Sequence, residues 1–240
     1  MSQKAFQFKE FKIEQDRCAM KIGTDGVLLG AWAPLNHQPD SILDIGTGTG
    51  VIALMLAQRS PALLIDALEI HEDAYEQAVD NFEQNNWGDR MFCYHAAFDE
   101  FVEEMQDEEK YELIISNPPF YAEDYTSDSA SRNKARFVEA LPFSELLEGV
   151  SKLLHPDGEF NTIIPHKEEA NFIALAREFD LFPKKITRVR GTETSEIKRS
   201  LLSFSFKEIV PEENELIIEI SRHNYTEGYK NLVKDFYLKL

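Results

Sequence analysis

The sequence predicts a doubly wound α/β fold, in which a mainly parallel sheet ends in a C-terminal antiparallel hairpin. From Ser41 onward, short apolar runs typical of buried strands alternate with segments of helical periodicity. Helices of this length between strands imply right-handed crossovers and therefore parallel neighbours. After Phe182 the alternation stops, and two strand-like runs follow each other across the loop Gly-Thr-Glu-Thr-Ser. That change in pattern predicts the hairpin.

Each element follows from its local pattern. Apolar runs predict parallel strands at residues 42–45, 63–68, 91–94, 111–116 and 159–164. Helical periodicity predicts helices at residues 51–57, 72–82, 99–106, 143–154 and 167–179. The hairpin is expected at residues 184–190 and 200–206, followed by a strand at 215–221 and a closing helix at 227–237.

Two segments lie outside this alternation. Residues 1–40 form an N-terminal extension, in which Asp25 is placed to cap a short helix over residues 27–32. Residues 41–240 are expected to form one globular domain, because the length of the chain suits one domain with a small addition. Residues 121–141 have little apolar content, and a loop of that length in a compact domain is usually functional or disordered.

Composition limits the location and the partners of the protein. The net charge is −18, which argues against a protein that coats itself with nucleic acid, although salt screening leaves local basic patches effective. No apolar run approaches the roughly 18 residues of a membrane span and the N-terminus has no signal-peptide core, so we expect a cytoplasmic protein. Cys18 and Cys93 have neither metal-ligand spacing nor a disulfide framework. We therefore expect two reduced thiols and no metal.

The most informative motif is the turn Asn117-Pro118-Pro119-Phe120, which follows the strand predicted at residues 111–116. Two consecutive prolines fix φ near about −65° and remove two N–H donors, so the turn is stiff. Its carbonyls and the Asn117 amide are left to accept hydrogen bonds from a ligand. Beside an aromatic ring, such a turn forms a socket for a planar group with an exocyclic amine.

A glycine-rich turn with Asp44, Gly46, Gly48 and Gly50 joins the first predicted strand to its helix. The glycines let the backbone approach a ligand closely, and Glu69 at the end of the second strand is placed to accept hydrogen bonds from a ribose diol. Dinucleotide sites use G-x-G-x-x-G, whereas the spacing here is G-x-G-x-G after a carboxylate. Asp44 would repel a phosphate but attract a sulfonium and an ammonium. This favours S-adenosylmethionine over NAD.

With a donor site and an acceptor turn in place, the chain resembles the class I methyltransferases, and Asn-Pro-Pro-Phe resembles their amine-methylating motif. A closer resemblance covers essentially the whole chain and is to the bacterial valine-tRNA adenine-37 N6-methyltransferases. It rests on the run from Lys21 to Trp32, on Asn224-Tyr225-Thr226 and on Phe236-Tyr237-Leu238. The resemblance implies a Rossmann-like methyltransferase sheet, with the N-terminal extension packed on the cofactor and substrate side.

The resemblance also implies roles for individual residues. The Asn117 side-chain oxygen and the Pro118 carbonyl would accept hydrogen bonds from the N6 amine of adenine, and Phe120 would stack on the base. Thr24 and Asn117 would join the glycine turn in holding the cofactor. One position departs from the family, because its usual acidic residue after the third strand falls on Ala97. We expect either Asp99 to replace that contact, or backbone N–H groups and stacking on Phe98 to bind the cofactor's adenine.

Two clusters of basic residues are candidates for contact with tRNA phosphates. The first lies in the loop after the proline turn and comprises Arg132, Lys134 and Arg136. The second lies in the hairpin, where only Glu193 and Glu196 are expected to oppose it, and comprises Lys184, Lys185, Arg188, Arg190, Lys198 and Arg199. The competing interpretation is a solvated sheet edge, where lysines block aggregation.

The sequence leaves three interpretations of the function. The terminal signatures favour methylation of adenine 37 in the anticodon loop of a valine tRNA. The same proline turn also suits a glutamine amide of a protein or the N2 amine of guanine in rRNA. A non-catalytic module that binds the cofactor or RNA is disfavoured, because the complete acceptor motif is present. We expect the protein to be a monomer.

Overall fold

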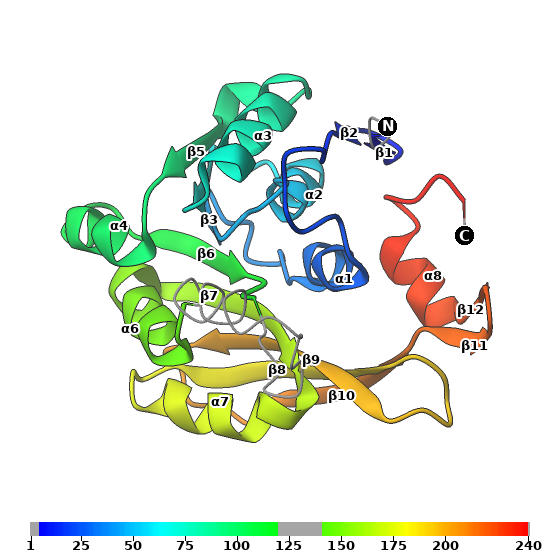
Figure 1. Cartoon of the computed structure of the whole chain (residues 1–240). Coiled ribbons are helices and arrows are strands. Elements are labelled where there is room, and N and C mark those ends of the chain that lie inside the picture. The colour runs from blue at the N-terminus through cyan, green and yellow to red at the C-terminus, as the bar shows by residue number, and fades with distance from the viewer. Residues whose placement is uncertain (1–4, 120–140, 240) are drawn as a thin grey trace, which may run out of the picture.

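In the computed structural model, which describes residues 5–119 and 141–239, one eight-stranded mixed sheet runs through the molecule (Figure 1). Its strands are β3 (Ser41–Ile45), β4 (Leu64–Glu69), β5 (Met91–His95), β6 (Tyr111–Ser116), β7 (Leu154–Pro165), β8 (Phe182–Arg190), β9 (Ile197–Ser205) and β10 (Glu212–Ile217). Their order in the sheet is β10-β8-β9-β7-β6-β3-β4-β5. The neighbours from β7 to β5 are all parallel, as predicted. β9 runs antiparallel to both β7 and β8, which confirms the predicted hairpin.

Helices cover both faces of the sheet (Figure 1). One face carries α1 (Thr24–Trp32), α2 (Val51–Arg59), α3 (Glu72–Glu83) and α8 (Glu227–Val233). The other carries α4 (Phe98–Met105), α6 (Phe143–Leu153) and α7 (Glu169–Arg177). Successive strand side chains alternate between the two cores, so that Ile42 packs into the first and Leu43 into the second. Because both faces are buried, the strands are apolar runs rather than alternating ones.

The two ends of the described chain meet on the first core. A short hairpin of β1 (Phe6–Gln7) and β2 (Lys12–Ile13) precedes α1. Lys9 N donates to Phe236 O at 2.9 Å, and the rings of Phe8 and Tyr237 are stacked with centroids 6.0 Å apart. The C-terminal signature that carries part of the resemblance therefore closes the core around the N-terminal segment.

Three predicted details are wrong. α1 begins at Thr24 after the N-cap Gly23, and Asp25 makes no cap because its carboxylate accepts from Arg199 instead. The strand predicted at residues 215–221 is divided into β10, which pairs parallel with β8, and β11 (Glu219–Ser221), which pairs with β12 (Asn224–Tyr225). The division occurs where the chain passes from β8 to a new partner, since Ile217 is paired with Arg190 and Glu219 is paired with Tyr225 of β12.

The third wrong detail is the end of the closing helix, which stops at Val233 rather than continuing to Tyr237. The chain continues as a turn in which Phe236 N and Tyr237 N both donate to Val233 O, and Phe236 is buried in the first core with Tyr229 and Val233. None of the helices within the described ranges is long and apolar enough to cross a membrane.

Candidate active site

The glycine turn between β3 and α2 leaves room for a ligand. Gly46, Gly48 and Gly50 have φ values of 71°, 58° and 80°, a region that glycine adopts at no steric cost. A Cβ added at Gly46 or Gly48 would meet no atom within 4 Å, whereas one at Gly50 would lie 2.5 Å from the ring of Phe82. The first two glycines thus face open space, and the third allows α3 to pack closely. Gly46 N also donates to Leu68 O at 2.8 Å, which ties the turn to β4.

Two buried carboxylates flank this turn. Glu69 accepts from Gly48 N and from His71 N, each at 2.9 Å. Asp44 Oδ2 accepts from Thr47 Oγ1 at 2.6 Å, while its buried Oδ1 has no hydrogen-bond partner among the described residues. Burial raises the pKa of Asp44 to about 7, and the hydrogen bond from Thr47 opposes that rise. An unpartnered carboxylate oxygen beside an open turn fits a cationic ligand group, and Glu69 at the strand end fits a diol.

Side chains of α3 make hydrogen bonds to the segment before α1 and to the glycine turn. Asn81, which is 1% exposed, accepts from Glu14 N at 2.9 Å and donates to Glu14 O at 2.8 Å and Thr49 O at 2.9 Å. Gln77 accepts from Arg17 N at 3.1 Å. Asn81 therefore connects the N-terminal segment, α3 and the glycine turn. The sequence analysis missed both residues, although a buried amide on the apolar face of a predicted helix is a signal that could have revealed them.

Asn81→Leu is expected to weaken the binding of S-adenosylmethionine, the cofactor that the sequence predicts, about tenfold or more, because it leaves the half-buried Glu14 and the buried Thr49 backbone groups without the partners they have in the structure, at up to about 1–3 kcal/mol each. The measurement is calorimetric titration of the cofactor, with thermal unfolding as a check on the fold. Asn85→Leu is the matched control, because the hydrogen bonds of the Asn85 side chain within the described residues go to the backbone of Lys12 and Asn81 and not to the glycine turn. Equal cofactor affinity in the two variants would refute the positioning role of Asn81.

The acceptor turn begins where β6 ends, beside the glycine turn. Ser116 is paired with Ile45 of β3, and its hydroxyl donates to Ile45 O at 2.9 Å. Asn117 follows half-buried and Pro118 buried. α1 passes close to this turn, because a Cβ added at Gly26 would lie 3.9 Å from Asn117 Nδ2. Phe120 and the loop cations Arg132, Lys134 and Arg136 lie outside the described residues.

The stretch expected to contact the cofactor's adenine comprises Ala97, Phe98 and Asp99, which differ in exposure. Ala97 is the N-cap of α4, and Asp99 is exposed in the first turn of that helix. Phe98 is 8% exposed and packs against α6, where a Cβ added at Gly149 would clash with its ring. Phe98 is thus a core residue, and its stacking on the cofactor stays a prediction. Among the described residues, no group of three His, Cys, Asp or Glu side chains is placed to hold a metal ion.

The basic residues of the hairpin are opposed by more acids than expected. The expectation of Glu193 and Glu196 alone is wrong, because β10 lies parallel to β8 and places Glu213 and Glu215 beside it. The ion pairs are Lys184–Glu159, Arg188–Glu169 (2.6 Å), Arg188–Glu213 (2.8 Å), Arg190–Glu215 (2.7 Å), Lys198–Glu196 (3.5 Å) and Arg199–Asp25 (2.8 Å). Lys185 instead lies over the ring of Trp32, with its ammonium 5.2 Å from the centroid. Phosphate contact by these residues stays a prediction.

Comparisons with known proteins agree with this geometry. The model of the methyltransferase small domain family matches residues 26–185. The tRNA1(Val) (adenine(37)-N6)-methyltransferase of Christiangramia forsetii is 66% identical over all of both chains, and that of Flavobacterium johnsoniae is 62% identical over 98% of this chain and all of the relative. A solved structure of a predicted O-methyltransferase from Agrobacterium tumefaciens has a TM-score of 0.67 at 18% identity, covering 88% of this chain and 96% of that one. This last likeness shows the fold alone.

These findings confirm the predicted family, the doubly wound fold and S-adenosylmethionine as the cofactor. The match to the first relative covers the whole length of the chain, in agreement with the extent of the sequence resemblance. The protein belongs to the methyltransferase small domain family and, within it, to the tRNA1(Val) (adenine(37)-N6)-methyltransferases.

Proposed function

We propose that this protein transfers a methyl group from S-adenosylmethionine to N6 of adenine 37 in the anticodon loop of a valine tRNA. The full-length relatives are named for that reaction. One observation in the structure carries the proposal. The glycine turn and the acceptor turn leave the adjacent parallel strands β3 and β6 at the same edge of the sheet, where Ile45 is paired with Ser116. A donor and an amine bound at these two turns would be neighbours.

The bound cofactor supplies an electrophilic methyl group on a sulfonium. The chain's own residues hold and orient the two reactants. Glu69 would accept hydrogen bonds from the ribose hydroxyls, and Asp44 would lie near the positive charge. The open backbone at Gly46 and Gly48 allows close approach. This arrangement makes the reaction mainly one of positioning, so that neither a metal nor a nucleophilic side chain is invoked for the transfer.

The acceptor turn prepares the amine. The N6 lone pair of adenine is delocalised into the ring and is a poor nucleophile. We assign the Asn117 side-chain oxygen and the Pro118 carbonyl as acceptors for the two N–H groups, which localises the lone pair on nitrogen. Pro119 keeps the turn stiff, and Phe120 is assigned to stack on the base. An adenine in a tRNA loop must first be unstacked, at a cost of about a few kcal/mol.

Residues 1–40 are assigned to the cofactor and substrate side, and 41–240 to the methyltransferase domain. Two contacts support this assignment, namely the bonds of Asn81 to Glu14 and Thr49 and the approach of Gly26 to Asn117. tRNA is the proposed partner, and the cytoplasm is the proposed location because tRNA is modified there. We assign the enzyme as a monomer.

The test is transfer of an isotopically labelled methyl group to unmodified valine tRNA, followed by mass analysis of the nucleosides. The expected product is N6-methyladenosine, and the same tRNA with guanine in place of adenine 37 should remain unlabelled. Finding N2-methylguanosine, or label in protein alone, would refute the proposed acceptor and favour one of the two other amines that such a turn accepts.

A further inference from the structure

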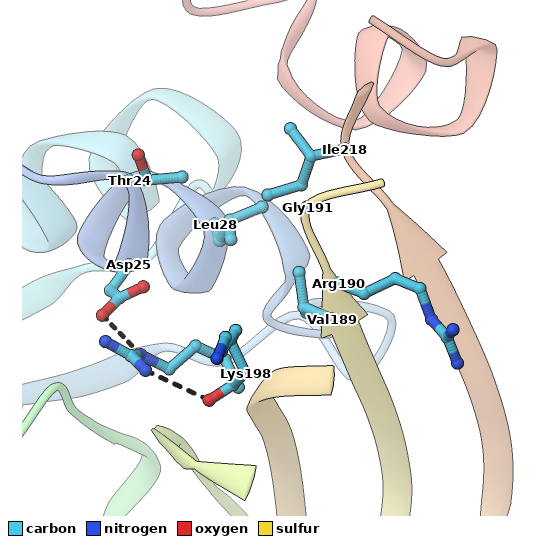
Figure 2. A pocket seen from close by; sticks show the side chains of 9 residues that line it. Thr24, Asp25, Leu28, Val189, Arg190, Gly191, Lys198 and Ile218 are labelled. Carbon is cyan, nitrogen blue, oxygen red and sulfur yellow. Dashed lines mark hydrogen bonds and ion pairs between the residues drawn. The ribbon is translucent and has the colours of Figure 1, made fainter. Parts of the chain in front are cut away.

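A pocket of about 380 Å³ lies between α1 and the ends of β8 and β9 that adjoin their connecting loop (Figure 2). Leu28, Val189 and Ile218 form its apolar side, where Leu28 and Val189 are buried and Ile218 is half-buried. Asp25, Lys198 and Arg199 line its charged side. This volume is near the lower limit of ligand sites, which are typically about 300–1,000 Å³. An apolar wall beside cations at this size suits a single nucleotide, with a base on one side and a phosphate on the other.

The pocket is lined by α1, the helix that passes close to the acceptor turn. Asp25 immediately precedes Gly26, and a Cβ added at Gly26 would lie 3.9 Å from Asn117 Nδ2. Thr24, which the sequence analysis assigned to the cofactor, also lines the pocket (Figure 2). An adenine bound at the turn must be unstacked from its neighbours in the RNA. The adjoining nucleotide is tethered to that adenine by one phosphodiester, so it must find a place close to α1.

Hydrogen bonds hold Arg199 on the charged side of the pocket. Arg199 Nε donates to Asp25 Oδ2 at 2.8 Å, and a terminal nitrogen of Arg199 donates to Lys198 O at 3.1 Å, which fixes this side chain along the wall. The Lys198 side chain is 68% exposed, and its partner Glu196 is 3.5 Å away and 88% exposed. An ion pair this exposed is weak. Arg190, by contrast, points away from the pocket toward β10 in Figure 2 and pairs with Glu215.

We propose that this pocket binds the nucleotide next to the target adenine, with its base against Leu28, Val189 and Ile218 and its phosphate at Lys198 and Arg199. The proposal rests on the proposed function, since it names where the RNA beside the methylated base is held. The Asp25–Arg199 pair acts as a positioning device, which joins the helix beside the acceptor turn to the phosphate-binding strand. The pocket would thereby help to select which adenine of an RNA reaches the turn.

Gly191 offers a way to fill the pocket. It lines the cavity with φ outside the left-handed region, and a Cβ added there would meet only Ser195 Oγ, at 3.7 Å. Gly191→Leu is expected to raise KM for valine tRNA about tenfold, the order of effect of one lost base contact. The affinity for S-adenosylmethionine and the Tm should stay unchanged. Gly191→Ala, which adds less volume, should raise KM for valine tRNA less than Gly191→Leu does.

The phosphate contact is tested by charge reversal on one strand. Lys198→Glu is expected to raise KM for tRNA and to lower the dependence of log affinity on log salt concentration by about one or more. Lys207→Glu is the matched control, because Lys207 is 67% exposed and follows the opposite end of β9, beside Asp157. It makes the same charge change in the same acidic protein, so any general electrostatic effect appears in both variants.

A tRNA that lacks one base can show which nucleotide occupies the pocket. Valine tRNA is prepared in two forms, each lacking the base of one neighbour of the target adenine. In the wild type, loss of the base that occupies the pocket should raise KM, and in Gly191→Leu the same loss should have no further effect. If the wild type methylates tRNA but Gly191→Leu and Lys198→Glu match Lys207→Glu, the pocket assignment is wrong. If the wild type methylates no tRNA, the proposed function is wrong, and the pocket assignment with it.

Discussion

Asn117→Ala is expected to lower kcat for methyl transfer by about 10²–10³-fold, the loss typical of removing one preorganised hydrogen-bonding group at a reacting centre. The physical reason is that the amine keeps its lone pair in the adenine ring when one of its two acceptors is missing. The affinity for S-adenosylmethionine should fall far less than kcat, because Asn117 is only one of the assigned cofactor contacts and Asp44, Glu69 and the glycine turn are untouched. Initial rates at saturating tRNA and cofactor measure kcat, and calorimetric titration measures the cofactor affinity.

A conservative variant separates chemistry from structure at this position. Asn117→Asp retains acceptor oxygens of similar size, so its kcat should fall less than that of Asn117→Ala. A purely structural role would instead lower Tm in both variants and leave the ratio of their kcat values near one. Wild-type kcat in Asn117→Ala would remove Asn117 from the mechanism. Nearly all of the effect should be in kcat rather than in KM, because the hydrogen bonds strengthen as the nitrogen becomes tetrahedral.

The parts of the fold that were predicted correctly are those with local patterns. The strands β3, β4, β5 and β6 are short apolar runs, and the positive φ values of Gly46, Gly48 and Gly50 reflect a glycine spacing visible in the sequence. The order of turn, helix and acidic strand end was enough to indicate a cofactor. The proline turn was recognised in the same way, since its stiffness is a property of the residues themselves.

The parts that were missed depend on contacts between distant residues. Asp25 and Arg199 are 174 positions apart, so a carboxylate that looked like a helix cap is committed to a strand of the hairpin. Asn81 reaches Glu14 across 67 positions. The hairpin looked strongly basic because Glu213 and Glu215 come after it in the chain, and only the parallel pairing of β10 with β8 brings them beside its arginines. No periodicity encodes such pairings.

Asp44→Asn is expected to stabilise the cofactor-free enzyme and to weaken the cofactor. Burial raises the pKa of Asp44 from its ordinary 3.8 to about 7. Between these values the folded state holds a proton that the unfolded state has lost, so the free energy of unfolding falls as pH rises through this window and stays low above it. The asparagine at this position in the variant does not titrate, so the free energy of unfolding of Asp44→Asn does not fall with pH for this reason. Its advantage over the wild type should therefore grow to at most about 4 kcal/mol above pH 7.

Cofactor binding should show the opposite preference. A sulfonium or ammonium beside Asp44 favours the ionised carboxylate, so below a pH of about 7 binding to the wild type must release a proton, and affinity should rise with pH up to that value. Asp44→Asn should bind more weakly and without this pH dependence. Asp66→Asn is the control, since burial also raises the pKa of Asp66 and one of its oxygens likewise accepts from a hydroxyl, that of Tyr111, but Asp66 lies inside β4, three residues before Glu69 at the strand end. Calorimetric titration across this pH range decides the matter, because equal wild-type affinity at both ends would exclude Asp44 from the cofactor site.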